Sequence, residues 1–166
     1  MVDRYRLFIQ YDLCFGCYAC ELACKQENNL PVGPRWIRVK QVGPREVNGK
    51  LTMDFVPLTC MHCSNPPCMD ACPEDAITKR EDGIVLISAD LCIGCLACLS
   101  ACPFGAPQIN PDLDVVEKCN LCLHRIEKGA SPACVQACPA GAIRFGDIHE
   151  ITEEIRQHKA VFLRSG

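Results

Sequence analysis

Sixteen cysteines dominate the chemistry available to this chain, and they fall into four groups of four. The third group, Cys92 to Cys102, reads C-x2-C-x2-C-x3-C followed by proline, a spacing typical of runs that bind [4Fe-4S] clusters. The first group, Cys14 to Cys24, has the same spacing without the proline. The second group, Cys60 to Cys72, and the fourth, Cys119 to Cys138, are spaced more widely and both end in proline. Because no cysteine is left over, the count predicts four [4Fe-4S] clusters.

Disulfides and zinc sites are the alternative uses of so many cysteines. Three cysteines packed as C-x2-C-x2-C suit disulfide bridges poorly, and the sequence begins without a secretory signal. Zinc sites pair two C-x2-C units across a loop, and only the fourth group resembles that pattern. A third cysteine at the spacing of the first and third groups has no use in a zinc site. The complete set therefore favours clusters.

A few other residues near the groups could take part in the chemistry. His62 could ligate iron, but its group already has four cysteines, which favours a surface or supporting role. Trp36 could lie on an electron path, although a core position on a strand face is the simpler interpretation. Lys118, Arg125 and Lys128 could raise the potential of a cluster or face a partner, and a solvated helix face is an equal alternative. No dinucleotide fingerprint, phosphate loop or nucleophile–base pair occurs, so the sequence predicts no catalytic machinery.

The composition agrees with a protein that depends on clusters. Only 6% of the 166 residues are aromatic, so the apolar core is expected to be modest and the cluster-free protein unstable. The formal net charge is −3, and each cluster with its four thiolates adds about −2, so the loaded protein would carry about −11. This negative charge argues against a nucleic-acid partner.

The sequence also bears on location. No stretch approaches the ~20 apolar residues of a membrane-spanning helix. Residues 1–10 contain neither an apolar signal core nor a twin-arginine pair. The chain is therefore expected to be cytoplasmic, or to be exported together with a partner that carries the signal.

Short regular elements are predicted between the cysteine groups. The cysteine-free segment 25–59 is predicted to be an inserted β-ribbon, with strands at 36–42 and 51–56 joined by the hairpin signal Asn48-Gly49. Further predictions are a strand at 5–10, a hairpin at 76–87, a polar connection at 108–116 and a helical turn at 123–129. A last helix is expected after Asp147, with Ile151 and Ile155 on its inner side.

Internal repeats predict the fold class. The first and third groups share the pattern Asp-Leu-Cys-x-Gly-Cys-x-Ala-Cys, which begins at Asp12 and at Asp90. The second and fourth groups match in their closing halves, Pro67–Pro73 and Ala133–Pro139. Two ferredoxin-like halves explain both matches. The expected class is therefore α+β, with short helices and strands arranged around the clusters.

The ordered motifs resemble the four-cluster electron-transfer subunits of molybdenum and tungsten oxidoreductases. The motifs are the Gly33-Pro34 loop before Trp36, the run Cys60–Cys68, Gly83-Ile84-Val85, the third group, and Lys118–Cys122 with Arg125-Ile126-Glu127. The family includes iron–sulfur subunits of dimethyl sulfoxide reductase, formate dehydrogenase and polysulfide reductase. The chain is also similar to the small subunit of bacterial tungsten aldehyde oxidoreductases.

The resemblance implies how the cysteines are shared among four clusters. The first cluster would be held by Cys14, Cys17, Cys20 and Cys138. The second would be held by Cys119, Cys122, Cys134 and Cys24. The third would be held by Cys60, Cys63, Cys68 and Cys102. The fourth would be held by Cys92, Cys95, Cys98 and Cys72.

The same resemblance implies a domain organisation. Residues 1–24 and 103–150 would form the half that holds the first two clusters, and residues 60–102 the half that holds the others. Residues 25–59 would be the inserted ribbon. Residues 151–166 would be a C-terminal helix and tail.

The resemblance implies an electron-transfer subunit rather than an enzyme by itself. Its partner would be a large molybdenum- or tungsten-pterin subunit, for example an aldehyde or formate oxidoreductase, and a flavin- or NAD-linked subunit could accept the electrons. The chain ends soon after its last cysteine group, which favours a soluble complex. The alternatives are a free-standing polyferredoxin and a hydrogenase-linked carrier. The even spread of the groups also allows head-to-tail stacking of copies.

Overall fold

Short strands and helices make up the protein, and few of them exceed ten residues. The computed structural model describes residues 4–164, except for the side chains of residues 158, 159 and 161–164. The strands are β1 (Tyr5–Ile9), β2 (Ile37–Val47), β3 (Lys50–Thr59), β4 (Ile77–Lys79), β5 (Val85–Ile87), β6 (Gln108–Asn110), β7 (Val115–Glu117) and β8 (Ile143–Asp147). The helices are the 3-10 turn η1 (Tyr11–Leu13), α1 (Ala19–Glu27), α2 (Pro67–Asp70), α3 (Ala97–Ala101), α4 (Leu123–Ile126), α5 (Ala133–Gln136) and α6 (Ile148–Arg164). This mixture is consistent with the predicted α+β, ferredoxin-like fold.

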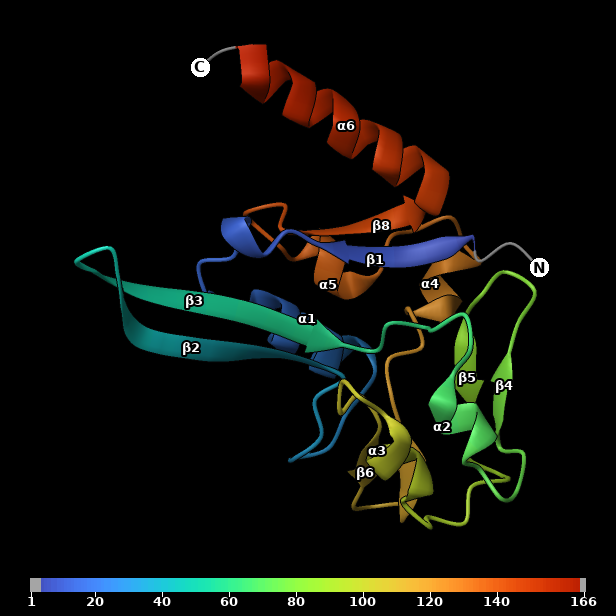
Figure 1. The fold of residues 1–166 in the computed structure, drawn as a ribbon. Helices are drawn as coiled ribbons and strands as arrows, with labels where there is room; N and C mark the ends of the chain where they lie inside the picture. The colour runs from blue at the N-terminus through green and yellow to red at the C-terminus, as the bar shows by residue number, and fades with distance from the viewer. Residues whose placement is uncertain (1–3, 165–166) are drawn as a thin grey trace.

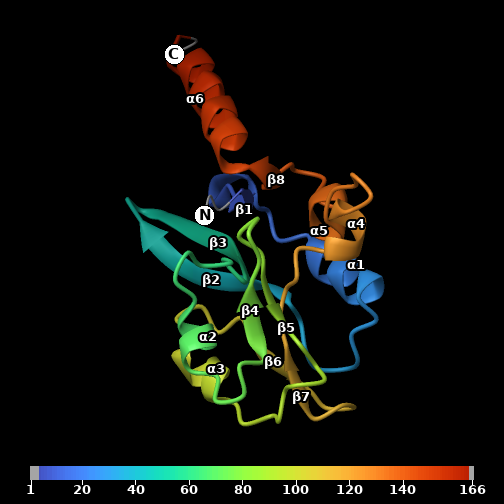
Figure 2. The same cartoon turned by 90° about the vertical axis from the view of Figure 1, so that its right-hand side faces the viewer.

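The two ends of the described chain pair with each other. β1 and β8 are antiparallel, with Tyr5 opposite Asp147 and Ile9 opposite Ile143. Figure 1 shows that this pairing brings the segment before the first cysteine group beside the segment after the fourth. The other sheets are hairpins of neighbouring strands: β2 with β3, β4 with β5, and β6 with β7. α1 packs against α5, and α2 packs against α3 (Figure 2).

The longest hairpin is the β2–β3 ribbon. Asn48 and Gly49 form its turn with φ of 53° and 76°, the left-handed conformations that a two-residue hairpin turn of this kind requires. The predicted turn is therefore confirmed, and both strands are longer than the alternating stretches of the sequence indicated. Ile37 and Val39 are buried near the start of β2, whereas the rest of that strand is exposed.

One prediction about local structure was wrong. Residues 108–116 were expected to be a polar connection, but they contain β6 and the start of β7. The Asn110 side chain accepts a hydrogen bond from the Asp112 N–H at 3.0 Å, and the Asn110 carbonyl accepts one from the Asp114 N–H at 3.0 Å. Polar residues thus build the turn, while Val115 and Val116 are buried. Because the two strands have only three residues each, the polar composition of this stretch did not indicate a hairpin.

Cysteines form much of the interior. Half of the sixteen are buried, and they pack with apolar residues such as Ile84, Leu121 and Ile143. Trp36 belongs to the same group, in agreement with its predicted core position. A second, smaller group gathers around Val85 and Val116. Half of the cysteines that could bind clusters therefore also help to fill the core.

The last described helix, α6, extends away from the sheet formed by β1 and β8 (Figures 1 and 2). The Asp147 carboxylate accepts a hydrogen bond from the His149 N–H at 2.8 Å, so the predicted N-terminal cap is confirmed. Ile151 is buried and Ile155 is half-buried, as expected for the inner side of the helix. Within residues 4–164, none of the helices combines the length and the apolar character needed to cross a bilayer.

Candidate iron–sulfur centres

Three cavities are each lined by four cysteines that come from two different groups. One cavity is lined by Cys14, Cys17, Cys20 and Cys138. A second cavity is lined by Cys60, Cys63, Cys68 and Cys102. A third cavity is lined by Cys72, Cys92, Cys95 and Cys98. In each case three cysteines of one sequence group meet a single cysteine of another group.

The remaining cysteines, Cys24, Cys119, Cys122 and Cys134, are all buried. Burial, and then the charges of Cys119 and Cys122, raise the pKa of Cys24. Burial, and then the charges of Cys119, Cys24 and Cys122, raise the pKa of Cys134. These four thiols therefore lie close enough to interact, and the packing of α1 against α5 brings Cys24 and Cys134 together.

Charge interactions also join one set of four to the next. Besides burial, the charge of a cysteine in one set raises the pKa of a cysteine in another. The pairs are Cys20 with Cys134, Cys60 with Cys119, and Cys68 with Cys98. The four sets therefore follow one another through the interior, starting from the set of Cys14 and ending at the set of Cys92.

The thiols fit an iron–sulfur cluster better than a single ion. Burial raises the pKa of Cys20 to about 12 and that of Cys98 to about 11, so several thiolates side by side need a positively charged core to neutralise them. The sulfurs of a tetrahedral zinc site lie about 3.8 Å apart, given zinc–sulfur bonds of about 2.3 Å. Among the described residues, no three His, Cys, Asp or Glu side chains are arranged to hold one ion. In each of the three cavities four cysteines instead line one common space, as the ligands of a cluster do.

Several N–H groups point at cysteine sulfur. The donors and acceptors are His62 N–H to Cys60 Sγ at 3.4 Å, Val116 N–H to Cys92 Sγ at 3.3 Å, Ala106 N–H to Cys102 Sγ at 3.5 Å, Leu121 N–H to Cys119 Sγ at 3.4 Å, and Asn28 Nδ2 to Cys24 Sγ at 3.7 Å. Hydrogen bonds to the ligand sulfurs are one of the factors that set the reduction potential of a cluster. The loops therefore supply electrostatic stabilisation together with the thiolates.

The loops of the first and third groups depend on glycine. Gly16 and Gly94 have φ of 73° and 67°, which glycine adopts without strain. A Cβ on Gly94 would lie 2.4 Å from the carbonyl oxygen of Asp114, and a Cβ on Gly16 would lie 2.4 Å from the Phe55 ring. Each glycine therefore allows a second segment to pack directly on the cysteine loop.

Two residues for which the sequence left alternative roles open, His62 and Lys118, are buried beside the cavity of Cys60. His62 is only 2% exposed, and its Nδ1 accepts a hydrogen bond from the Val85 N–H at 3.0 Å. Its role is therefore a supporting one in the interior, and the surface alternative was wrong. Lys118 is only 4% exposed and lines the cavity, so a solvated helix face is wrong for this residue.

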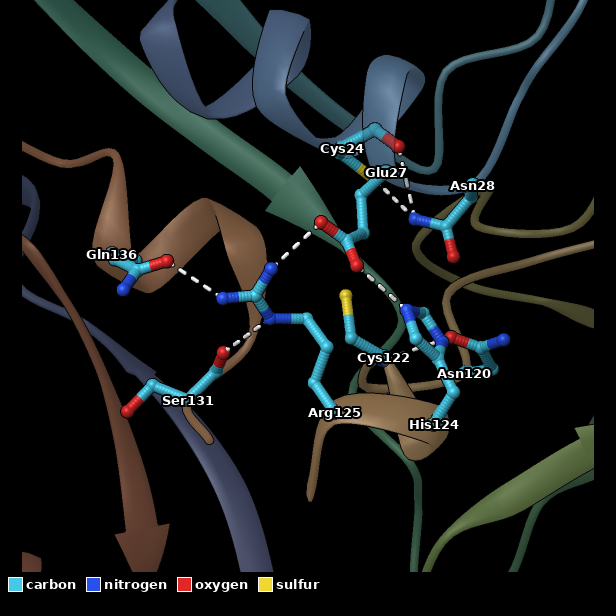
Figure 3. Close-up of polar contacts among 9 residues, drawn as sticks. All are labelled: Cys24, Glu27, Asn28, Asn120, Cys122, His124, Arg125, Ser131 and Gln136. Atoms are coloured by element: carbon cyan, nitrogen blue, oxygen red, sulfur yellow. Dashed lines mark hydrogen bonds and ion pairs between the residues drawn. The ribbon is translucent and has the colours of Figure 1, made fainter. Parts of the chain in front are cut away.

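A polar network holds the set of Cys24 in place, and Figure 3 shows it. Glu27 on α1 accepts a hydrogen bond from His124 Nε2 and forms an ion pair with Arg125 Nη1, both at 2.7 Å. Arg125 also donates to the Ser131 carbonyl at 2.8 Å and to Gln136 Oε1 at 2.6 Å. Helices α1, α4 and α5 are thereby tied together around the thiols (Figure 3). Nothing in the sequence singled out Glu27, because its partners lie nearly a hundred residues away.

Comparison with known proteins agrees with this chemistry. The 4Fe-4S dicluster domain matches residues 51–148, and a second family of the same description matches residues 13–76. The chain is 39% identical to a protein from Halobacterium salinarum that is named as an iron–sulfur subunit of dimethyl sulfoxide reductase, over 97% of this chain and 72% of the relative. It belongs to the family of iron–sulfur subunits of molybdenum oxidoreductases.

Other members of the family are similar over most of their length. One of the chains of polysulfide reductase from Wolinella succinogenes is 38% identical, with 95% of this chain and 83% of the relative aligned. The thiosulfate reductase electron transfer subunit from Salmonella typhi is 40% identical, with 90% and 79% aligned. Membership confirms the prediction of an electron-transfer subunit rather than a catalytic chain. Two dicluster domains and 16 cysteines fit four [4Fe-4S] clusters.

Proposed function

We propose that this chain connects a large molybdenum- or tungsten-pterin catalytic subunit to an electron acceptor or donor through a row of four [4Fe-4S] clusters. An aldehyde or formate oxidoreductase is the expected kind of partner. The observation that carries the proposal is the continuous succession of four cysteine sets through the interior. An electron that entered at one end could cross the whole protein by short steps between neighbouring clusters.

Each cluster would be held by one of the four sets. The ligands would be Cys14, Cys17, Cys20 and Cys138 for the first cluster, Cys119, Cys122, Cys134 and Cys24 for the second, Cys60, Cys63, Cys68 and Cys102 for the third, and Cys92, Cys95, Cys98 and Cys72 for the fourth. Three cavities lined by four cysteines each, and the mutual influence of the four remaining thiols, support this assignment. When bound, the clusters supply one-electron chemistry, and the chain fixes their positions and their electrostatic surroundings.

The two ends of the row would be the places where electrons enter and leave. Cys17 in the first set and Cys95 in the fourth are exposed, whereas the second set is buried. Phe15 is 59% exposed beside Cys17, and Ile93 is 63% exposed beside Cys95. Exposed apolar side chains around a redox centre suit contact with another protein. We expect the catalytic subunit at the first end and the other partner at the fourth.

The domain organisation follows from the same sets. Residues 1–24 with 103–150 would be one ferredoxin-like half and residues 60–102 the other, with 25–59 as the inserted ribbon and 151–166 as helix and tail. The pairing of β1 with β8, and the packing of α1 on α5 and of α2 on α3, support this division. Residues 1–3, 165 and 166 lie outside the described part of the chain. A cytoplasmic location stays a prediction, which cell fractionation tests.

Anaerobic purification of the native complex through a tag on this chain tests the proposal. We expect a large subunit that contains molybdenum or tungsten with pterin, and about 16 irons per copy of this chain. The same iron content without any partner would support a free-standing polyferredoxin instead. Nickel in the complex would support a hydrogenase-linked carrier. Zinc without sulfide would refute the cluster assignment altogether.

Serine variants test the ligand sets directly. Cys14→Ser and Cys138→Ser should alter the same cluster signal in electron paramagnetic resonance, although the two cysteines belong to different groups. Cys24→Ser should alter the signal that Cys119→Ser alters, and should leave the signal of the Cys14 set unchanged. If Cys24→Ser and Cys14→Ser alter one common signal, the sets follow the sequence groups and the proposed assignment is wrong.

A further inference from the structure

A buried lysine lies beside the third cysteine set, and electron transfer as such does not require it. Lys118 lines the cavity of Cys60, Cys63, Cys68 and Cys102 and is only 4% exposed. Its neighbour in sequence, Cys119, belongs to the second set. Lysine is almost never fully buried unless its charge has a partner. The position of Lys118 between two cysteine sets therefore calls for a physical reason.

Two backbone carbonyls fix the ammonium group. Lys118 Nζ donates a hydrogen bond to the carbonyl of Val85 and another, at 3.3 Å, to the carbonyl of Cys119. The same Val85 residue donates its N–H to His62 Nδ1 at 3.0 Å. Val85 is thus held between the imidazole on one side and the ammonium on the other. The lysine side chain has a defined place in the interior and does not extend to solvent.

The cysteines of the third set are the groups that would carry negative charge near Lys118 when a cluster is bound. Within the described chain its ammonium has two carbonyl partners and forms no ion pair with a carboxylate. Lys118 lines the cavity of the third set, and it touches the second set only through its hydrogen bond to the Cys119 carbonyl. Its charge therefore acts on the third set most and on the second set less.

We infer that Lys118 raises the reduction potential of the third cluster, and to a smaller extent that of the second. This inference rests on the ligand sets proposed above. Reduction adds one negative charge to a cluster, so a fixed cation nearby stabilises the reduced state, and the low dielectric of the interior strengthens the effect. Lys118 is thus a positioning residue, which acts through the third cluster and shifts the electron toward the middle of the row.

Substitution of Lys118 in the cluster-loaded full chain, purified in its native complex, tests the inference. Lys118→Met removes the charge and keeps most of the stem, whereas Lys118→Arg keeps the charge. Lys50→Met removes an exposed lysine at the tip of the β2–β3 ribbon and serves as the matched control. A redox titration followed by electron paramagnetic resonance gives the potential of each cluster. Cys63→Ser identifies the signal of the third cluster.

The expected result is a more negative potential for the third cluster in Lys118→Met, with a smaller shift for the second cluster and none for the first and fourth. Lys118→Arg should keep the potential of the third cluster close to the wild-type value, and Lys50→Met should cause no shift. If Lys118→Met loses iron, Lys118→Gln, which can still donate to the two carbonyls, is titrated in its place. Equal shifts in the Met and Arg variants, or no shift at full iron content, would overturn the inference.

The outcome also separates this inference from the proposed function. Iron content, the number of cluster signals and the copurifying subunit are measured on the wild-type complex and report on the proposed function. If all three results are as expected and the cluster potentials are the same with and without a charge at position 118, only the role of the lysine is wrong. If Cys63→Ser and Lys118→Met act on different signals, Lys118 does not act mainly on the cluster of its own cavity, and the inference fails.

Discussion

Gly94 allows a direct test of how the third cysteine group is held in place. It lies between Cys92 and Cys95 with φ of 67°, and a Cβ at this position would lie 2.4 Å from the carbonyl oxygen of Asp114. Asp114 belongs to the β6–β7 turn, and its N–H donates to the carbonyl of Asn110 at 3.0 Å. The atom in the way is backbone, so it cannot rotate aside. Gly94→Ala must therefore move either the turn or the cysteine loop.

Gly94→Ala should lower the free energy of unfolding through two effects. A residue with a Cβ in the left-handed region loses about 1–2 kcal/mol, and overpacking against Asp114 adds a loss of about 1–3 kcal/mol. Gly141→Ala is the matched control, because Gly141 has φ of 60° and nothing within 4 Å of an added Cβ. The control incurs only the first effect. At about 2–4 °C per kcal/mol for a chain of this size, Gly94→Ala should unfold about 2–12 °C below the control.

The assay is thermal bleaching of the clusters, followed by visible absorbance at one heating rate for the wild type and both variants in the native complex. Iron per chain is measured beforehand, and we expect Gly94→Ala to contain less iron because its loop carries three ligands of the proposed fourth cluster. Equal midpoints and equal iron contents for the two variants would refute the reasoning. The β6–β7 turn would then yield easily and would not hold the cysteine loop.

Three further substitutions test the surroundings of the first and second sets. Glu21→Ala removes a buried carboxylate that accepts a hydrogen bond from the Val39 N–H at 2.5 Å, so the free energy of unfolding should fall by about 1–3 kcal/mol. Glu46 is exposed, so Glu46→Ala should change the melting temperature little in the same thermal melts. A hydrogen bond from His124, followed by the Arg125 interactions, lowers the pKa of Glu27. A lowered folded pKa means that the pairs stabilise the protein above pH of about 4.3 and that this stability is lost as the pH falls through the folded pKa. Glu27→Gln should therefore be less stable at pH 7 and show a flatter acid dependence in melts between about pH 5 and about pH 3, the range over which the stability is lost, and an unchanged acid slope would contradict this account. Asn28→Leu removes the hydrogen-bond donor to Cys24 Sγ at 3.7 Å, so a redox titration should give a more negative potential for the second cluster. Gln26 lies on the exposed side of α1, and Gln26→Leu should leave that potential unchanged.

Much of this structure can be predicted from local signals in the sequence. Asn48-Gly49 specifies its turn through backbone preference alone, and Asp147 caps α6 through a contact within two residues. The spacing of the cysteines indicates the kind of cofactor, because it reflects the geometry of a loop around a cluster. The β6–β7 hairpin was missed because three residues per strand give too little alternation to stand out from a polar stretch.

Properties that depend on packing between distant segments could not be predicted. Lys118 follows directly after β7 and has the composition of a surface residue, and only the approach of Val85 shows that it is buried. The polar contacts of Glu27 with His124 and Arg125 join segments that no local pattern relates. The sharing of cysteines between groups came from the family resemblance, since spacing alone does not say where the last cysteine of a run points.

Helix α1 shows why that sharing is physically natural. Cys20 and Cys24 are one turn apart on it and both are buried, yet Cys20 lines the cavity of Cys14 while Cys24 interacts with Cys119. One turn advances the chain by about 5.4 Å, so a single short helix can present one thiol to each of two neighbouring sites. A helix that held two clusters in this way would also fix the separation between them. Since half of the cysteines are also part of the core, the same contacts stabilise the fold and would keep the proposed electron path short.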